Sequence, residues 1–198
     1  MSRISPVPSS ETGFRTKLAF LFVRKGMAKL AGRELEAALE PVQVFAHKPG
    51  LLNAYGKLEQ ATAKLDGLDE RLNHLAQLKA ATMINCEYCI DLGSQVARRA
   101  GFSDDELLDL PRYRDSDLFS ELDKLVLDYV VGMSRTPVDV TDELFAALRT
   151  HLDESQMVEL THLIAIENFR GRFNSGVGIG AAGFSEGMVC AMPEPIAA

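Results

Sequence analysis

Apolar residues recur with helical spacing along most of this chain, and no stretch alternates cleanly between apolar and polar positions as a β-strand would. The longest stripe consists of Leu118, Phe119, Leu122, Leu125, Val126, Tyr129, Val130 and Met133. These positions fall on one side of a helix, so the pattern predicts a long amphipathic helix that ends before Pro137.

Capping signals predict where further helices begin. Ser103 and Glu106 have the spacing of a capping box, Thr141 can cap a helix to about His151, and Asp153 can open one towards Phe169. Residues 12–31, 49–65 and 69–83 also show helical patterns, with breaks predicted at Gly32, Pro41, 48–50, 66–67 and Asn85. We therefore predict an all-α fold.

A weak internal repeat accompanies these helices. His74-Leu75 lies twelve residues before Cys86, and His162-Leu163 lies twelve residues before Asn174. The spacing predicts a duplication of two helical halves, of which only the first retains cysteines. Chance similarity between two pairs of amphipathic helices is the alternative.

The pattern also predicts the domain organisation. Residues 1–184 should form a single helical domain with an N-terminal helix at about 12–31, and 185–198 should form a tail. This tail has no periodicity and contains Gly187, Pro193 and Pro195, so we expect an arm or a partly disordered segment. Cys190 in the tail is interpreted as incidental.

Cys86-Glu-Tyr-Cys89 is the main candidate for chemistry. On a helix the two thiols would share a face and could form a disulfide. If Asn85 caps this helix, both thiols lie in the first turn, where the helix dipole favours the reactive thiolate. Two alternatives remain open, namely a pair of inert buried thiols and half of a zinc site, although no second CxxC or CxxH follows.

Composition limits the partners and the compartment. The net charge of −7 argues against nucleic acid or an anionic membrane as a partner, and the longest apolar run, 18–23, is too short to span a bilayer. The N-terminus lacks the basic-then-apolar order of a secretory signal. Three cysteines in 198 residues do not make a disulfide framework, so we expect a cytoplasmic protein.

Three segments have a familiar sequence: residues 68–89, which end in the CxxC, 167–174 (Glu-Asn-Phe-Arg-Gly-Arg-Phe-Asn) and 46–55. They resemble the carboxymuconolactone decarboxylase / alkylhydroperoxidase-D (AhpD)-like family, and the resemblance covers roughly residues 40–184. It implies an all-helical fold that assembles into homo-oligomers, with a dimer or trimer expected here. It also implies that redox members act as thiol peroxidases.

The redox branch of this family has a Glu twelve residues before the first Cys and a His four residues after the second. Cys86 and Cys89 match this pattern, but His74 stands at the Glu position and Gly93 at the His position. Gly93 would leave a gap one turn below Cys89, which the imidazole of His74 could occupy. An imidazole exchanges protons near neutral pH, so His74 is a candidate proton relay. The alternative is a packing histidine.

Other polar or aromatic residues are interpreted structurally. Glu87 and Asp91 are expected to be solvated first-turn carboxylates, Tyr88 a packing residue, His47 a turn residue and His162 a structural residue.

The leading hypothesis is a thiol peroxidase without metal or cofactor. By resemblance, Cys89 attacks a peroxide, Cys86 resolves the sulfenic acid, and an external dithiol or thioredoxin-like protein reduces the disulfide.

Two other functions remain open. One is a lyase acting on a small lactone, in which Arg170 and Arg172 would hold a carboxylate. The other is a non-catalytic oligomeric helical protein with a vestigial cysteine pair, for which Gly93 is the best support.

Overall fold

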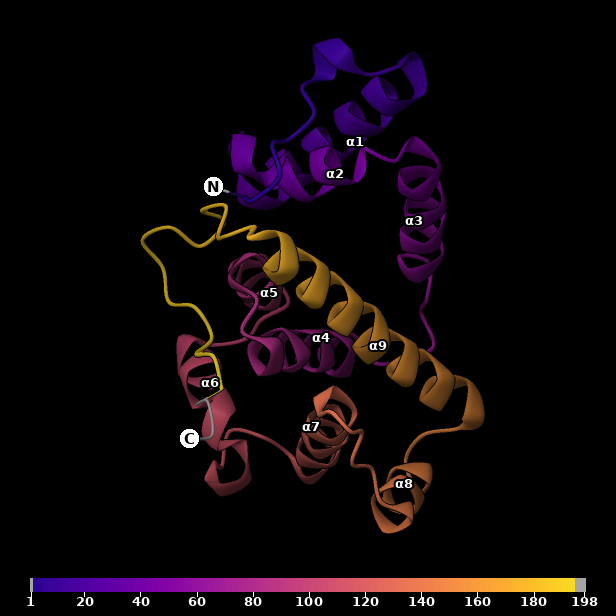
Figure 1. The fold of residues 1–198 in the computed structure, drawn as a ribbon. Helices are drawn as coiled ribbons and strands as arrows, with labels where there is room; N and C mark the ends of the chain where they lie inside the picture. The colour runs from indigo at the N-terminus through magenta and orange to yellow at the C-terminus, as the bar shows by residue number, and fades with distance from the viewer. Residues whose placement is uncertain (1, 195–198) are drawn as a thin grey trace.

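The computed structural model describes residues 2–194, which contain nine α-helices, short 3₁₀ turns and no strand (Figure 1). The helices are α1 (Phe14–Ala31), α2 (Glu40–Phe45), α3 (Pro49–Thr62), α4 (Glu70–Ile84), α5 (Glu87–Arg99), α6 (Asp104–Asp109), α7 (Glu121–Ser134), α8 (Asp142–Arg149) and α9 (Glu154–Val177). The predicted all-α fold is confirmed.

Helix α4 lies at the centre of the molecule, where it packs against α5, α7 and α9 (Figure 1). Its side chains serve two hydrophobic clusters. Leu75 and Leu78 belong to the cluster that includes α5, whereas Leu72 and Ala76 belong to the one shared with α7 and α9. The central helix is therefore buried on two sides, which explains why eight of its fifteen residues are buried.

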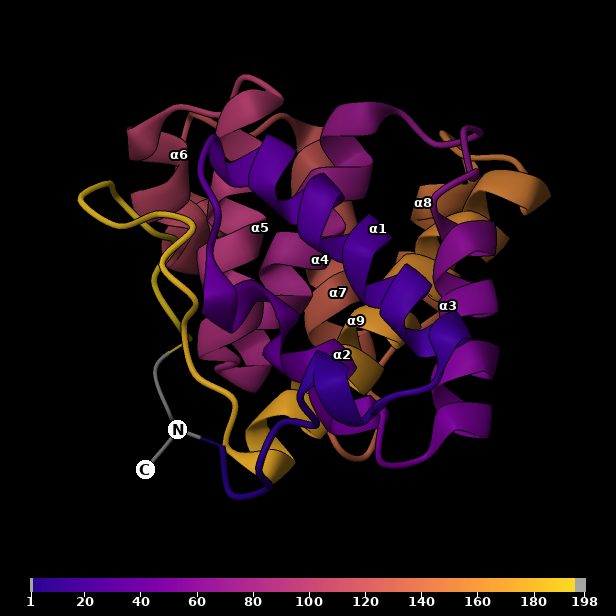
Figure 2. The ribbon, with the colours of Figure 1, turned by 90° about the horizontal axis from the view of Figure 1, so that it is seen from above.

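Helices α1 to α3 form one end of the molecule, and in Figure 2, viewed from this end, they lie in front of the other helices. The sequence pattern indicates a break at Pro41 and does not predict α2, but Pro41 lies in the first turn of this helix, where a missing N–H costs nothing. Phe45 of α2 stacks on Tyr55 of α3 and on Phe173 of α9, with ring centroids 4.8 and 3.9 Å apart. This aromatic stack joins the end to the rest of the fold.

Most helix starts agree with the capping signals. Ser103 and Asp153 each form a complete capping box, and Thr141 accepts a hydrogen bond from Leu144 N. The helix that carries the long apolar stripe, α7, begins later than predicted, at Glu121, and Ser120 is its N-cap. Helix α9 is longer than predicted and ends only where Gly178 adopts a left-handed conformation (φ 76°).

The internal duplication stays a prediction. The chain breaks between α4 and α5 just before Cys86, whereas α9 runs without interruption through Asn174. The two segments that appeared to correspond in sequence therefore differ in local structure.

Residues 179–194, here called the C-terminal segment, lie against α5 and α6 rather than forming a free arm (Figure 1). The carboxylate of Asp91 accepts four backbone N–H groups from Ala182, Gly183, Phe184 and Ser185, at 2.7 to 3.0 Å. Ser94 Oγ accepts from Ala191 N at 3.0 Å. Within 185–194, the backbone N–H groups of Ser185 and Ala191 find buried acceptors on α5, so this stretch does not form the free arm that the sequence suggested. Residues 195–198 lie outside the described residues.

The C-terminal segment ends at a buried lysine. Lys79 of α4 is fully buried, donates to Leu110 O at 3.3 Å and pairs with Glu194. Burial lowers the pKa of Lys79, while the Glu194 carboxylate opposes that shift.

Among residues 2–194, none of the helices combines the length and the apolar character that a membrane-spanning helix needs.

Candidate functional site

The cysteine pair lies at the junction between α4 and α5. Asn85 is the C-cap of α4 in a left-handed conformation (φ 54°), which Asn tolerates better than most residues. Cys86, rather than Asn85, is the N-cap of α5, and its Sγ accepts a hydrogen bond from Cys89 N at 3.3 Å. The expectation that Asn85 caps this helix is therefore wrong, although both cysteines do lie at the helix start.

The two cysteines form a disulfide with Cα atoms 5.2 Å apart. Both are buried, Cys86 with 1% and Cys89 with 6% of its surface exposed. They belong to a hydrophobic cluster whose members include Ala38, Val44 and Phe184. Cys190 is free and packs against the same cluster without joining the disulfide.

Asn174 of α9 brings a polar group to this apolar site. Its Nδ2 lies 3.7 Å from Cys89 Sγ and 3.9 Å from Cys86 Sγ, and the residue is 4% exposed. Helix α9 approaches closely because of Gly171, one turn earlier, where an added Cβ would lie 3.4 Å from Cys86 Cβ and 3.2 Å from Ile84 Cγ2. The sequence pattern does not identify Asn174 as a site residue, although the internal repeat places it at the position that corresponds to Cys86.

His74 does not occupy the position that the sequence suggested. The space beside Gly93 is filled by Leu78, whose Cδ1 would lie 3.1 Å from a Cβ added there. The imidazole of His74, one turn earlier on α4, lies 3.5 Å from Glu70 Oε1 and has no polar contact with either sulfur within residues 2–194. The gap proposed for the imidazole is thus already filled, and a relay role for His74 stays a prediction from the resemblance.

Comparison with known proteins places this site in a family. The family model described as "Carboxymuconolactone decarboxylase family" matches residues 49–128, which include both cysteines. The uncharacterized protein YnjA of Escherichia coli is 39% identical over 177 residues, covering 87% of this chain and 92% of YnjA. The chain belongs to the carboxymuconolactone decarboxylase family.

Solved structures agree with this fold. The chain is similar to the AhpD core of an uncharacterized peroxidase-related protein from Ralstonia eutropha, with a TM-score of 0.73 and 17% identity over 91% of this chain and 92% of the other. It is also similar to the debrominase Bmp8, with a TM-score of 0.73 and 19% identity over 87% and 91% of the two chains. At these identities the likeness shows the shared AhpD-like fold.

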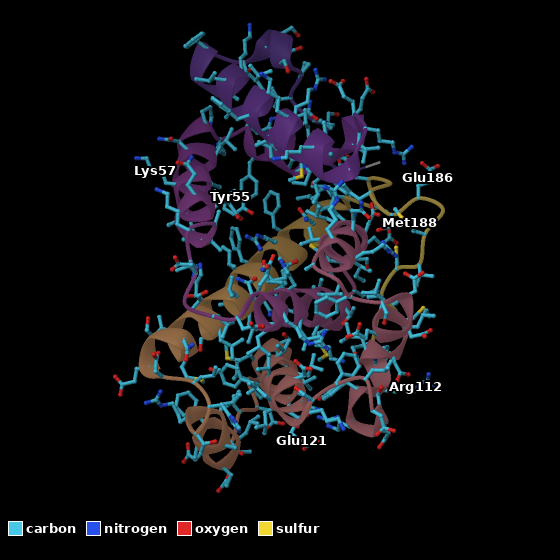
Figure 3. All side chains as sticks on the ribbon, turned by 180° about the vertical axis from the view of Figure 1, so that it is seen from behind. Tyr55, Lys57, Arg112, Glu121, Glu186 and Met188 are labelled. Atoms are coloured by element: carbon cyan, nitrogen blue, oxygen red, sulfur yellow. A yellow bond between two sulfur atoms is a disulfide. The ribbon has the colours of Figure 1, made fainter. Side chains whose placement is uncertain are left out.

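A second polar cluster of this family member surrounds Arg170 on α9. The guanidinium donates to Glu59 Oε1 at 2.9 Å, to Glu167 Oε2 at 2.8 Å and to Gln77 Oε1 at 2.9 Å. Figure 3 shows Tyr55 reaching from α3 towards this side of α9 while Lys57 points away. Arg170 is therefore already paired with two carboxylates, whereas Arg172, the other arginine considered for a substrate carboxylate, donates to Thr136 Oγ1 at 3.3 Å.

The pKa values of the two carboxylates beside Arg170 shift in opposite directions. Burial raises the pKa of Glu167, against the attraction of Arg170. Burial also acts on Glu59, but its hydrogen bond and ion pair with Arg170 outweigh this effect and hold its pKa below the ordinary value. The cluster thus contains a Glu59–Arg170 ion pair beside a second carboxyl group, Glu167, whose pKa burial raises.

The remaining candidate residues have structural partners. Asp91 is buried beneath the C-terminal segment, so its interpretation as a solvated carboxylate is wrong, whereas Glu87 is exposed. Tyr88 is buried and donates to Ala38 O at 2.8 Å, and His162 Nε2 lies 2.8 Å from Thr62 Oγ1. Two surface pockets of about 560 and 320 Å³ lie along α9, and His162 is among the residues that line each of them. Neither pocket is lined by a cysteine.

Proposed function

We propose that this protein is a dithiol–disulfide oxidoreductase that reduces peroxides through Cys89 and Cys86. The observation that carries the proposal is the cysteine pair at the start of α5, whose sulfurs are bonded to each other and share one hydrogen-bond donor, the amide of Asn174. Family membership and the fold shared with a peroxidase-related protein support it. We also propose a cytoplasmic homo-oligomer as the working form.

The cycle starts from the reduced pair. The Cys89 thiolate attacks one oxygen of a peroxide, the O–O bond breaks, and the leaving oxygen takes a proton to give an alcohol or water. Cys86 then attacks the Cys89 sulfenic acid, which forms the disulfide and releases water. An external dithiol, such as a thioredoxin-like protein, reduces this disulfide by two exchange steps and becomes oxidised itself.

Exposure and hydrogen bonding support the assignment of roles. Cys89 is the more exposed of the two cysteines, at 6% against 1%, so it is the better placed for peroxide and for the external dithiol. Cys86 is the better leaving group when the disulfide is reduced, because its Sγ receives the Cys89 N–H at the positive end of α5.

Peroxide consumption with a dithiol donor tests the proposal. Cys89→Ser should abolish turnover, and Cys86→Ser should stop at a sulfenic acid that a sulfenic-acid probe detects. Cys190→Ser serves as a matched control and should retain the wild-type rate. Wild-type turnover no faster than that of the Cys86→Ser/Cys89→Ser variant would refute the proposal and leave the non-catalytic alternative.

A further inference from the structure

The carboxamide of Asn174 is the side chain that contacts both sulfurs. Its Nδ2 carries two N–H groups, so one amide can donate to Cys89 Sγ at 3.7 Å and to Cys86 Sγ at 3.9 Å. Among residues 2–194, these sulfurs have one other hydrogen-bond donor, the backbone N–H of Cys89, which donates to Cys86 Sγ. Cys89 Sγ therefore depends on Asn174 alone for a hydrogen bond.

The surroundings make this single donor important. The sulfurs lie within an apolar cluster to which Met27, Ala31 and Val177 also contribute. A thiolate in such surroundings is costly unless it accepts hydrogen bonds, and bonds to a charged acceptor are the stronger ones. Cys86 is the N-cap of α5 and its sulfur accepts a backbone N–H, whereas Cys89 is the third residue of the helix and its sulfur accepts no backbone N–H within residues 2–194.

We infer that Asn174 is a catalytic residue of the thiol site, which donates its amide hydrogens to whichever sulfur carries the negative charge. In the reduced enzyme it stabilises the Cys89 thiolate that attacks the peroxide. When an external dithiol attacks Cys89 and breaks the disulfide, the same amide stabilises the departing Cys86 thiolate. This inference rests on the proposed function.

The backbone around Asn174 holds the amide in place. Asn174 O accepts from Ile179 N at 2.9 Å where the chain leaves α9, and Gly178 N donates to Ser175 O at 3.2 Å. Together with the close contact at Gly171, these bonds define both the distance and the rotation of the last helical turn relative to the disulfide. The position is thus built into the end of α9 rather than left to a flexible loop.

Three variants in a Cys190→Ser background test the inference. Asn174→Leu removes the amide, and Asn174→Asp keeps its size but places an acceptor, and a negative charge when ionised, beside the sulfurs. Asn168→Leu is the matched control, because Asn168 lies on the same helix but donates to Ser134 Oγ and Ile164 O instead. The readouts are the thiolate absorbance of the reduced protein as a function of pH and the rate of thiol alkylation at neutral pH.

Both Asn174 variants should raise the pKa of the reactive thiol and slow alkylation roughly 10- to 100-fold, the scale of a hydrogen bond to a charged group. Asn168→Leu should titrate like the parent protein. If Asn174→Leu does not fold, the near-isosteric Asn174→Asp decides alone. Thiol titration that is unchanged in the Asn174 variants overturns the inference even if peroxide turnover is intact. Perturbed titration without peroxide turnover in the parent refutes the proposed function instead.

Discussion

Leu78 of α4 packs directly against Gly93 of α5, so that a Cβ on Gly93 would lie 3.1 Å from Leu78 Cδ1. The two helices approach closely at this point because one of them lacks a side chain. The position where related redox proteins are expected to carry a histidine is therefore a packing contact in this chain.

Introducing that histidine should cost stability. Gly93→His has to displace Leu78, and we expect the free energy of unfolding to fall by about 1–3 kcal/mol, the usual cost of overpacking. Urea denaturation measures this. The cost should shrink in a Leu78→Ala background, because the shortened side chain leaves room; equal costs in both backgrounds would show that Leu78 does not hold the position.

His74→Ala tests the relay hypothesis. Since the imidazole lies 3.5 Å from Glu70 Oε1 and makes no polar contact with the sulfurs among residues 2–194, we expect peroxide turnover to fall by less than about 10-fold. Loss of a general base usually costs ~10²-fold or more. A loss of that size, with normal turnover in a Glu70→Gln control, would establish His74 as the relay.

Glu167 should give stability a distinct pH dependence. Burial raises its pKa, so the carboxyl group binds its proton more tightly in the folded state than in the unfolded chain. The stabilising contribution of Glu167 to the free energy of unfolding is complete below its ordinary pKa of about 4.5. This contribution is lost as the pH rises through the pKa of the folded state. Glu167→Gln should remove this decline from urea unfolding curves measured between about pH 4 and pH 8. The exposed Glu154→Gln should leave the decline in place, and a wild-type profile that Glu167→Gln does not alter would contradict the assignment.

Asp91→Ala should release the C-terminal segment. The carboxylate accepts four backbone N–H groups, and without it these donors lose a charged acceptor. We expect a loss of about 3 kcal/mol in unfolding free energy and rapid proteolysis within 179–194. Glu87→Ala, an exposed carboxylate on the same helix, is the control; equal protease resistance in the two variants would show that Asp91 is dispensable.

Oligomerisation should depend on α1. The apolar stripe on α7 packs largely inside the fold, with Val126 and Val130 fully buried, whereas α1 leaves Phe14 81% and Phe22 67% exposed. We expect light scattering to give a wild-type mass above the 21.7 kDa of one chain, and Phe14→Ser/Phe22→Ser to shift it towards that value. A wild-type monomer at micromolar concentration would refute both expectations.

Most of the helices were predictable because their apolar spacing and their caps are local properties of the sequence, whereas α2 was missed because Pro41 looked like a break. Ser103 and Asp153 each place a side-chain acceptor where the first helical N–H groups need it, and the predicted starts at these residues agree with the structure. Cys86 was harder to place, because Asn85 suits either a helix start or a left-handed helix end. The structure uses it for the end.

The cysteine pair itself could be found from spacing, but its surroundings could not. Asn174 contacts sulfurs 85 and 88 positions earlier, and Asp91 accepts from donors more than 90 positions later. Such contacts depend on how the helices pack, which the local pattern does not contain. His74 does not lie beside Gly93 as the sequence suggested, for a related reason: the sequence alone does not show that Leu78 fills that space.

The 88 positions between Cys86 and Asn174 also have a consequence for synthesis on the ribosome. At about 5–20 residues per second, Asn174 is added roughly 4 to 18 s after Cys86. During that interval the nascent chain carries its thiol pair without the helix and the segment that later cover it. The thiols are then open to oxidants and to other thiols, so the site gains its selectivity only after nearly the whole chain has been made.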